Sequence, residues 1–310
     1  MPLDAFLLAL ASAGLHAAWN VMLAGAEDTR ATTAGALGLL TLVCLPLSAI
    51  TWDFEAQVVP YVTLSVVLEV AYFVLLATAY SRAELGVVYP IARGAAPVLV
   101  LIGAFAAGRG DPTALQVAGV VLVAAGVLVL RGGAAGAATR DIGLALAIGA
   151  TIAGYIVADD AGLDHAATIP YLAIVVGVPG LVYASWFVAG TGAASARSLG
   201  FAASLGPARL LDRRARRRAA LRHAARAGLS TLRRQLTART AAIAAAMVTA
   251  LGLALAALEL ADPAPVAAIR ESSVLLAALA APRLLGERGG RARLAGAAAV
   301  FAGVAAVAAG

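Results

Sequence analysis

The feature that most constrains the fold is a long apolar stretch that recurs along the whole chain. A helix needs ~20 apolar residues to cross the ~30 Å hydrocarbon core of a bilayer, and each stretch is close to that length. The sequence therefore predicts an all-α polytopic membrane protein with ten transmembrane helices. The predicted spans are residues 4–24, 31–52, 58–80, 85–107, 113–131, 141–161, 168–190, 239–261, 264–285 and 292–310.

Composition excludes an ordinary soluble enzyme. Hydrophobic residues form 62% of the 310-residue chain and charged residues only 13%, whereas charged residues are ~25% of a typical soluble domain. Cys44 is the single cysteine, which excludes a disulfide framework and a cysteine-based metal site. The sequence also has no Walker A string and no Gly-rich nucleotide fingerprint. We therefore expect no cofactor and no bound metal, and we expect any transport to be driven by a gradient.

Internal similarity predicts that the chain consists of two related halves. A shift of 136 residues places Trp19 on Tyr155, and a shift of 177 places Gly126 on Gly303. Chance matching in an Ala-rich chain is the alternative explanation. Five spans is an odd number, so the second half must enter the membrane from the opposite side, which gives the inverted repeats typical of secondary transporters. The predicted five-helix repeats span residues 1–133 and 139–310.

An Arg-rich insert at about residues 191–238 interrupts the second repeat. Eleven arginines and one acid, Asp212, lie between residues 207 and 239. A helical wheel gathers five apolar side chains on one side, which predicts an amphipathic helix that binds anionic lipid. A flexible solvated loop is the alternative, and the absence of aromatic residues among these arginines argues against nucleic-acid binding. The apolar side consists of Leu221, Ala225, Leu229, Leu232 and Leu236.

Ionisable residues lie near the middle of several predicted spans, where each costs at least ~2.5 kcal/mol. Glu69, Arg93, Arg270 and Glu271 are all within a few residues of the midpoint of their spans. We expect Glu69 to form an ion pair with Arg93 or Arg270. Such a pair serves either the substrate path or only the structure of the bundle.

Polar and aromatic residues accompany these charges. His16, Trp19 and Asn20 share one face of the first span, because they are three and four residues apart. Aromatic rings would line the substrate, an arginine would bind an anionic group, and Glu69 or His16 would carry a proton. For Asn20, an interhelical hydrogen bond is an equal alternative to substrate contact. The predicted substrate-binding residues are His16, Trp19, Asn20, Glu69, Tyr72, Tyr89, Arg93, Tyr155, Arg270 and Glu271.

Prolines mark the fourth and ninth spans, the two that carry the arginines. Pro90 and Pro97 lie in the fourth span, and Pro263 and Pro265 lie at the start of the ninth. Proline lacks a backbone donor, so these positions predict kinks or breaks, which often accompany binding sites in transporters.

Three strings carry a family resemblance: His16-Ala17-Ala18-Trp19-Asn20, Tyr89-Pro90-Ile91-Ala92-Arg93-Gly94, and Ile269-Arg270-Glu271-Ser272-Ser273 followed by Gly286-Glu287. In this order, within ten spans, they resemble EamA-type permeases of the drug/metabolite transporter superfamily. The resemblance covers about 260 residues. It implies two five-helix inverted repeats around a central cavity and alternating-access transport of small metabolites, often export. All 23 basic residues are arginine, which together with the excess of alanine suggests a high-GC bacterial gene, so we expect the protein in the bacterial inner membrane. A homodimer is compatible with this resemblance. Two features depart from the family pattern: Gly108-Arg109 stands where a Gly-Glu pair is expected, and the Arg-rich insert has no familiar counterpart.

The pair Asp159-Asp160 provides the alternative function, an intramembrane enzyme acting on a lipid-linked substrate. Paired carboxylates can hold Mg²⁺ and diphosphate, but no second acidic cluster at a suitable spacing follows. The simpler interpretations are solvated residues at a helix end, or the mouth of the transport path. We therefore predict that the protein is not an enzyme.

Loop arginines predict the membrane orientation. Short loops after odd-numbered spans contain Arg30, Arg82, Arg131, Arg140, Arg288, Arg291 and Arg293, whereas those after even-numbered spans contain only Arg109. Because arginine-rich loops stay in the cytoplasm, both termini should lie outside. A C-terminal alkaline phosphatase fusion should be active and a C-terminal fluorescent-protein fusion dark. The reverse pattern would show that the orientation is inverted.

Overall fold

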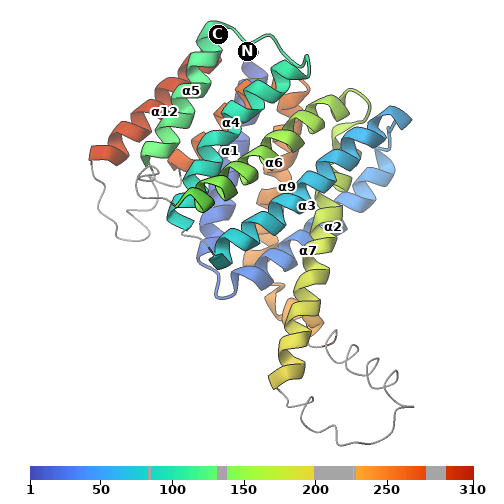
Figure 1. Cartoon of the computed structure of the whole chain (residues 1–310). Helices are drawn as coiled ribbons and strands as arrows, with labels where there is room; N and C mark the ends of the chain where they lie inside the picture. Colours follow the sequence, from blue (N-terminus) through green and yellow to red (C-terminus); the bar gives the residue numbers. More distant parts are fainter. Residues whose placement is uncertain (83–84, 131–137, 199–225, 227, 277–290) are drawn as a thin grey trace, which may run out of the picture.

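The computed structural model describes residues 1–82, 85–130, 138–198, 226, 228–276 and 291–310. Within these ranges the protein is helical and contains no strand, apart from one isolated bridge between Phe54 and Ala166. Figure 1 shows the helices side by side in one bundle, with the N- and C-termini at the same end. The predicted all-α class is therefore confirmed.

Most described helices begin and end close to the predicted apolar stretches. The exceptions are α7, which continues past residue 190 to Ser198, and α10, which ends at Arg270 although the predicted ninth span runs to residue 285. Six of the described helices are long and apolar enough to cross a membrane: α1, α2, α3 with η1, α6, α7 and α9. The apolar parts of α4, α5 and α12 are shorter. The bounds are α1 (Leu3–Ala24), α2 (Thr29–Ile50), η1 (Ala56–Val58), α3 (Val59–Arg82), α4 (Leu85–Ala106), α5 (Ala114–Leu130), α6 (Thr139–Leu163), α7 (Thr168–Ser198), α9 (Ala238–Leu258), α10 (Pro263–Arg270) and α12 (Arg291–Ala309).

The exterior of the bundle is apolar and its interior holds polar groups, which suits a lipid solvent. Large side chains such as Ile50, Ile102 and Phe301 are exposed, whereas Asp160 and Glu271 are buried. In water this distribution would leave a large apolar surface unprotected, but in lipid it places apolar groups against acyl chains. Both the apolar surface and the lengths of the helices are therefore those of a multi-pass membrane protein.

Local sequence explains where helices start. Asp28 caps α2 by accepting a hydrogen bond from the backbone N–H of Ala31 at 3.0 Å, and Thr237 caps α9 through Thr240. Pro263 lies in the first turn of α10, where the missing N–H costs nothing because that donor has no partner in a helix. The prolines of the ninth span therefore start a helix rather than kink one. Pro90 and Pro97 lie inside α4, whose helical assignment is continuous.

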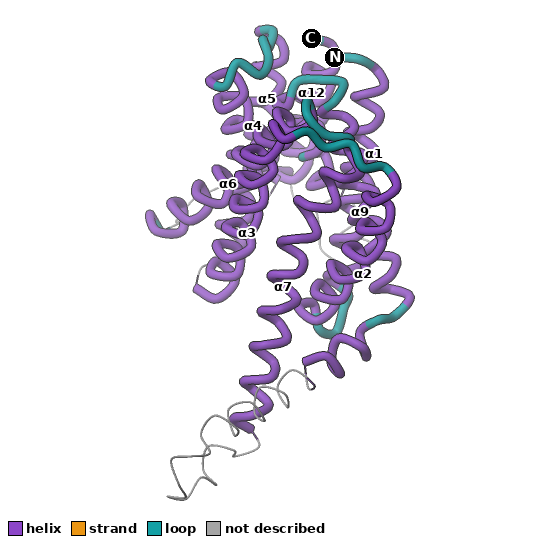
Figure 2. The backbone as a smooth tube through the Cα atoms, turned by 90° about the vertical axis from the view of Figure 1, so that its right-hand side faces the viewer, coloured by secondary structure: helices purple, strands orange, loops and turns teal. Residues whose placement is uncertain are grey.

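The structure revises the predicted insert at both ends. Helix α7 continues to Ser198, so residues 191–198 prolong it; its 31 residues correspond to ~46 Å, more than the thickness of a bilayer core. Figure 2 shows this end of α7 extending past its neighbours. At the other end of the insert, Leu232 packs against Ala31, Ala34 and Phe187 rather than facing lipid. Leu229 and Leu236 are exposed, and Leu221 and Ala225 lie outside the described residues.

Helices far apart in the chain form the main contacts of the bundle. The best-packed pairs are α1 with α9, α2 with α7, α3 with α6, α4 with α6, and α5 with α12. Of these, α5 and α12 approach most closely, through two glycines on each helix. A Cβ atom at Gly126 would lie 2.8 Å from the carbonyl oxygen of Gly296, and one at Gly303 would lie 2.7 Å from that of Gly119. Small residues let membrane helices approach to backbone contact, so these glycines set the spacing of the pair.

Replacing an interface glycine should therefore destabilise the bundle. Gly126→Ala and Gly303→Ala must push α5 and α12 apart, at a cost of ~1–3 kcal/mol. Gly38→Ala in α2 is the matched control, because no atom lies within 4 Å of its added Cβ. Thermal unfolding of the purified proteins in detergent should rank both interface variants below wild type and Gly38→Ala at or above it. Equal melting temperatures for all three variants would contradict the assigned packing.

Candidate functional site

Four helices place polar side chains around one cavity inside the bundle. His16 comes from α1, Arg93 from α4, Tyr155 from α6 and Arg270 from the end of α10, with Glu271 directly after it. These five residues are separated by up to 255 positions in the sequence. The structure thus brings together five of the ten predicted substrate-binding residues.

Arg93 is the centre of the hydrogen-bond network in this cavity. Its Nη1 donates to Glu271 Oε1 at 3.1 Å, and its Nη2 lies 2.6 Å from His16 Nε2. A guanidinium has only donors, so Nε2 of His16 must accept and the ring is neutral in this arrangement. The ion pair is well shielded, with side-chain exposures of 15% for Arg93 and 5% for Glu271. The N-terminal helices α1 and α4 are thereby joined to the segment that follows α10 inside the bundle.

The cavity is small, and both polar and apolar side chains line it. Apolar side chains from α4 and α6 complete it, and its interior has room for about one water molecule. A metabolite does not fit into this volume, so solute binding requires a more open arrangement of the helices. The remaining lining residues are Ala96, Pro97, Ile152, Ile156, Ala267 and Ser273.

The expected ion pair of Glu69 with Arg93 or Arg270 is wrong for this structure. Among the described residues, Arg93 pairs with Glu271 instead, and no ion pair is formed by Glu69. Glu69 interacts electrostatically with Asp159 and Arg270 at longer range. The reason for the difference is that Glu271 follows α10 directly and faces α4, a relation that the position of a residue within its own span does not reveal.

The other predicted residues surround the cavity at varying distances. Tyr72 lines a second, mainly apolar cavity, which shares Arg93 and Ile152 with the first. Trp19 packs edge-on against the His16 ring, with centroids 4.9 Å apart. Asn20 donates from Nδ2 to the backbone oxygen of His16 at 2.7 Å. Its amide nitrogen is thus used within α1 rather than between helices.

Tyr89 is the tenth predicted residue. It belongs to α4, but its side chain lies outside the described part of the structure. Its contacts are therefore not part of the site described here.

Asp159 and Asp160 are buried and point to different partners. Asp159 Oδ1 accepts hydrogen bonds from Ser65 at 2.5 Å and from Tyr171 at 2.9 Å. Tyr171 can reach it because Gly162 leaves space: a Cβ there would lie 2.5 Å from the tyrosine ring. The interpretation of the pair as solvated helix-end residues is therefore wrong. The two carboxylates thus have separate partners.

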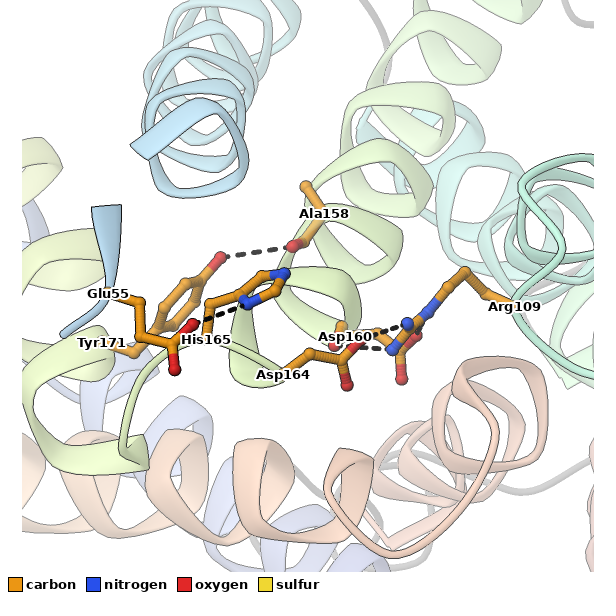
Figure 3. Close-up of polar contacts among 7 residues, drawn as sticks. All are labelled: Glu55, Arg109, Ala158, Asp160, Asp164, His165 and Tyr171. Atoms are coloured by element: carbon orange, nitrogen blue, oxygen red, sulfur yellow. Dashed lines mark hydrogen bonds and ion pairs between the residues drawn. The ribbon is translucent and has the colours of Figure 1, made fainter. Parts of the chain in front are cut away.

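Asp160 is bound by Arg109, which reaches back from the loop after α4 (Figure 3). Arg109 Nε donates to Asp160 Oδ2 at 2.6 Å, and Nη1 donates to Asp164. Gly108 and Gly110, on either side of the arginine, have φ values of 67° and 119°. Such angles are readily adopted only by glycine, so the Gly-Arg-Gly sequence ends α4 and turns Arg109 towards α6.

Further contacts join the loops at the same end of the bundle. Glu55, before η1, pairs with His165 at 3.2 Å, and its backbone N–H donates to the His165 carbonyl at 2.9 Å. Thr168 at the start of α7 donates to Glu259 after α9. Together with Arg109 these contacts link four loops at this end of the bundle, and we call this group of residues the loop seal. We define it as Glu55, Arg109, Asp160, Asp164, His165, Thr168 and Glu259.

The sequence contained partial signals for these additional residues. Arg109 stood out as a departure from the family pattern, and its partners lie in the Asp159-Asp160 region that was considered for another role. Ser65 and Tyr171 carried no signal, because a serine or tyrosine in an apolar helix is unremarkable until its partner is known. A polar residue in one span predicts that a partner exists, but not which one.

Comparison with known proteins adds information on the fold. No family model matches the sequence, and no curated protein matches it. Among solved structures, 21 chains match. One crystal structure has a TM-score of 0.66 and 15% sequence identity, over 99% of this chain and 96% of that chain. The chain therefore shares its fold with a solved structure over nearly its whole length, and at this identity the likeness extends to the fold alone.

Charge pairing in the loop seal should make stability depend on pH. The hydrogen bond from Arg109 lowers the pKa of Asp164, and the same bond raises the pKa of Arg109. A lowered carboxyl pKa stabilises the folded state above the unfolded pKa of ~3.9, and this contribution is lost as pH falls through the folded value. Asp164→Asn should remove it, at a cost of no more than ~1 kcal/mol because Asp164 is exposed.

The measurement is the melting temperature between pH 7 and pH 3. Asp164→Asn should lower it at neutral pH and flatten its decline in acid. Asp111→Asn is the control, an exposed carboxylate in the loop that carries Arg109 but without an ion pair among the described residues. Identical pH profiles for wild type and Asp164→Asn would show that the pair contributes nothing.

Proposed function

We propose that the protein is a secondary carrier or facilitator that exports small metabolites across the bacterial inner membrane by alternating access. The observation that carries this proposal is the cavity among α1, α4, α6 and α10, where charged side chains lie at membrane depth. Intramembrane charges are costly and typically mark a solute or ion path. The proposed site consists of His16, Arg93, Tyr155, Arg270 and Glu271, with Glu69 as the proton carrier.

The packing of the helices supports the proposed inverted repeat and EamA-like identity. Let α1 to α5 correspond to α6, α7, α9, α10 and α12 in that order. Exchanging each helix for its counterpart turns the pair α1–α9 into α6–α3 and the pair α4–α6 into α10–α1, and all four pairs are in contact. The pairs α2–α7 and α5–α12 map onto themselves. A twofold relation between two five-helix halves accounts for this pattern.

Alternating access also accounts for the closed state of the cavity. The loop seal links four loops at one end of the bundle, and the cavity has room for about one water molecule. Rocking of one half against the other would separate loops at one end and open a path to the cavity. In this proposal the Arg109 contacts break when that end opens.

The lipid-linked enzyme is the weaker alternative. It requires two carboxylates that act together, whereas Asp159 binds Ser65 and Tyr171, and Asp160 binds Arg109. We also retain the proposal that the Arg-rich insert contacts anionic lipid. Arg226, Arg233 and Arg234 are exposed, so they are available to headgroups.

Transport in proteoliposomes tests the function. Metabolites that accumulate in the medium of overexpressing cells, but not of deletion cells, identify the solute. The purified full-length protein should move that solute chemically unchanged. Glu69→Gln keeps the size and one acceptor, so it should fold normally, abolish transport driven by a pH gradient and spare solute exchange.

Glu27→Gln, an exposed carboxylate in the loop after α1, is the control and should transport like wild type. Normal pH-driven transport by Glu69→Gln would remove Glu69 from the mechanism. Absence of any solute movement, or chemical conversion that depends on Asp159, would contradict the carrier function itself.

A further inference from the structure

Three consecutive residues at the end of α10 have a buried polar atom without a partner. Among the described residues, Arg270 Nε, Glu271 Oε2 and Ser272 Oγ form no hydrogen bond. Buried polar groups in proteins are nearly always paired, since an unpaired group loses its hydration without compensation. Arg270 and Glu271 also line the cavity, so their two unpaired atoms indicate a place where an additional molecule completes the hydrogen bonds, whereas Ser272 is not among the lining residues.

The two arginines of the cavity differ in how their charge is satisfied. Arg93 already binds Glu271 and His16. Arg270 also lines the cavity, but it makes no ion pair among the described residues. Three carboxylates interact with it electrostatically without an ion pair: Glu271, Asp159 and Glu69. Of these, Glu271 is paired with Arg93, and Asp159 accepts hydrogen bonds from Ser65 and Tyr171. Of the two arginines in the cavity, Arg270 is therefore the one without a close counter-ion among the described residues.

The surroundings of Arg270 suit an anion. A guanidinium presents parallel donors that match a carboxylate or a phosphate. Tyr155 and Ser273 line the same cavity and offer hydroxyl groups, while Ala96, Ile152 and Ile156 supply apolar walls. Exclusion of water by such walls strengthens a charge-assisted hydrogen bond.

We propose that Arg270 binds the anionic group, a carboxylate or phosphate, of the transported solute, whereas Arg93 holds the helices together through Glu271. This inference rests on the proposed carrier function and specifies the solute class for its cavity. It follows that Arg270 has no essential structural partner. Loss of its charge should leave the empty protein as stable as wild type or more stable, because an uncompensated buried charge is removed.

Binding of small anions to the purified full-length protein in detergent tests the inference. Sodium formate and inorganic phosphate are the probes, formamide is the neutral counterpart of formate, and methylammonium is the cation, all at constant ionic strength. Thermal unfolding of wild type should shift upwards with formate or phosphate at millimolar concentrations and remain unchanged with formamide and methylammonium. A response to formate alone would identify a carboxylate site, and a response to phosphate alone a phosphate site.

Arg270→Gln should weaken the response at least about tenfold in apparent affinity. Arg270→Lys keeps the charge without the fork and should fall in between. The matched control is Arg140→Gln, an exposed arginine at the start of α6, which should respond like wild type. The empty Arg270→Gln protein should melt at or above the wild-type temperature.

Four results would overturn the inference: no anion response in wild type, an undiminished response in Arg270→Gln, stabilisation by methylammonium instead, or clear destabilisation of empty Arg270→Gln. Transport measurements separate this failure from that of the proposed function. A solute carried equally well by wild type and Arg270→Gln contradicts only the anion site. Anion binding at Arg270 without transport of any solute contradicts only the carrier function.

Discussion

The ion pair between Arg93 and Glu271 is the interaction on which the arrangement of the interior depends. In a bilayer, either charge alone would be very unfavourable, so the two side chains require each other. Arg93 lies on α4 and Glu271 lies directly after α10, and the two residues are 178 positions apart in the sequence. Because His16 also contacts Arg93, a third helix is fixed by the same guanidinium. The cavity is the space that remains around this junction.

Two kinds of contact hold the rest of the bundle. Where α5 meets α12, glycines on both helices permit backbone contact. At one end of the bundle, in contrast, charged and hydroxyl side chains of four loops form the loop seal. Close apolar packing is retained in lipid through shape and dispersion. Ion pairs near water are weak and exchange readily, and in the proposed carrier this would allow these contacts to break when a path opens.

The distribution of unsatisfied groups separates charges that have close partners in the protein from Arg270, which we propose binds solute. Asp160 and Asp159 each have close partners on neighbouring elements, and so does Arg93. Arg270 lines the same cavity as Arg93 but has only longer-range interactions with carboxylates among the described residues. A charge retained in the membrane without a close partner must be compensated in another way. In a carrier, the solute provides that compensation during part of the cycle.

The sequence predicted where most of the helices lie, because the length of an apolar segment is set by the thickness of the bilayer and is readable residue by residue. It also determined which residues are unusual, since His16, Arg93, Arg270 and Glu271 are expensive at membrane depth wherever their partners lie. Only the tertiary structure decided the pairing. Glu69 and Glu271 are equally plausible partners for Arg93 in a list of residues, and Arg109 has no apparent reason to bind Asp160. A hydrogen bond forms only when the donor and acceptor atoms are placed to within a few tenths of an ångström. That placement follows from the packing of the whole bundle rather than from any single span.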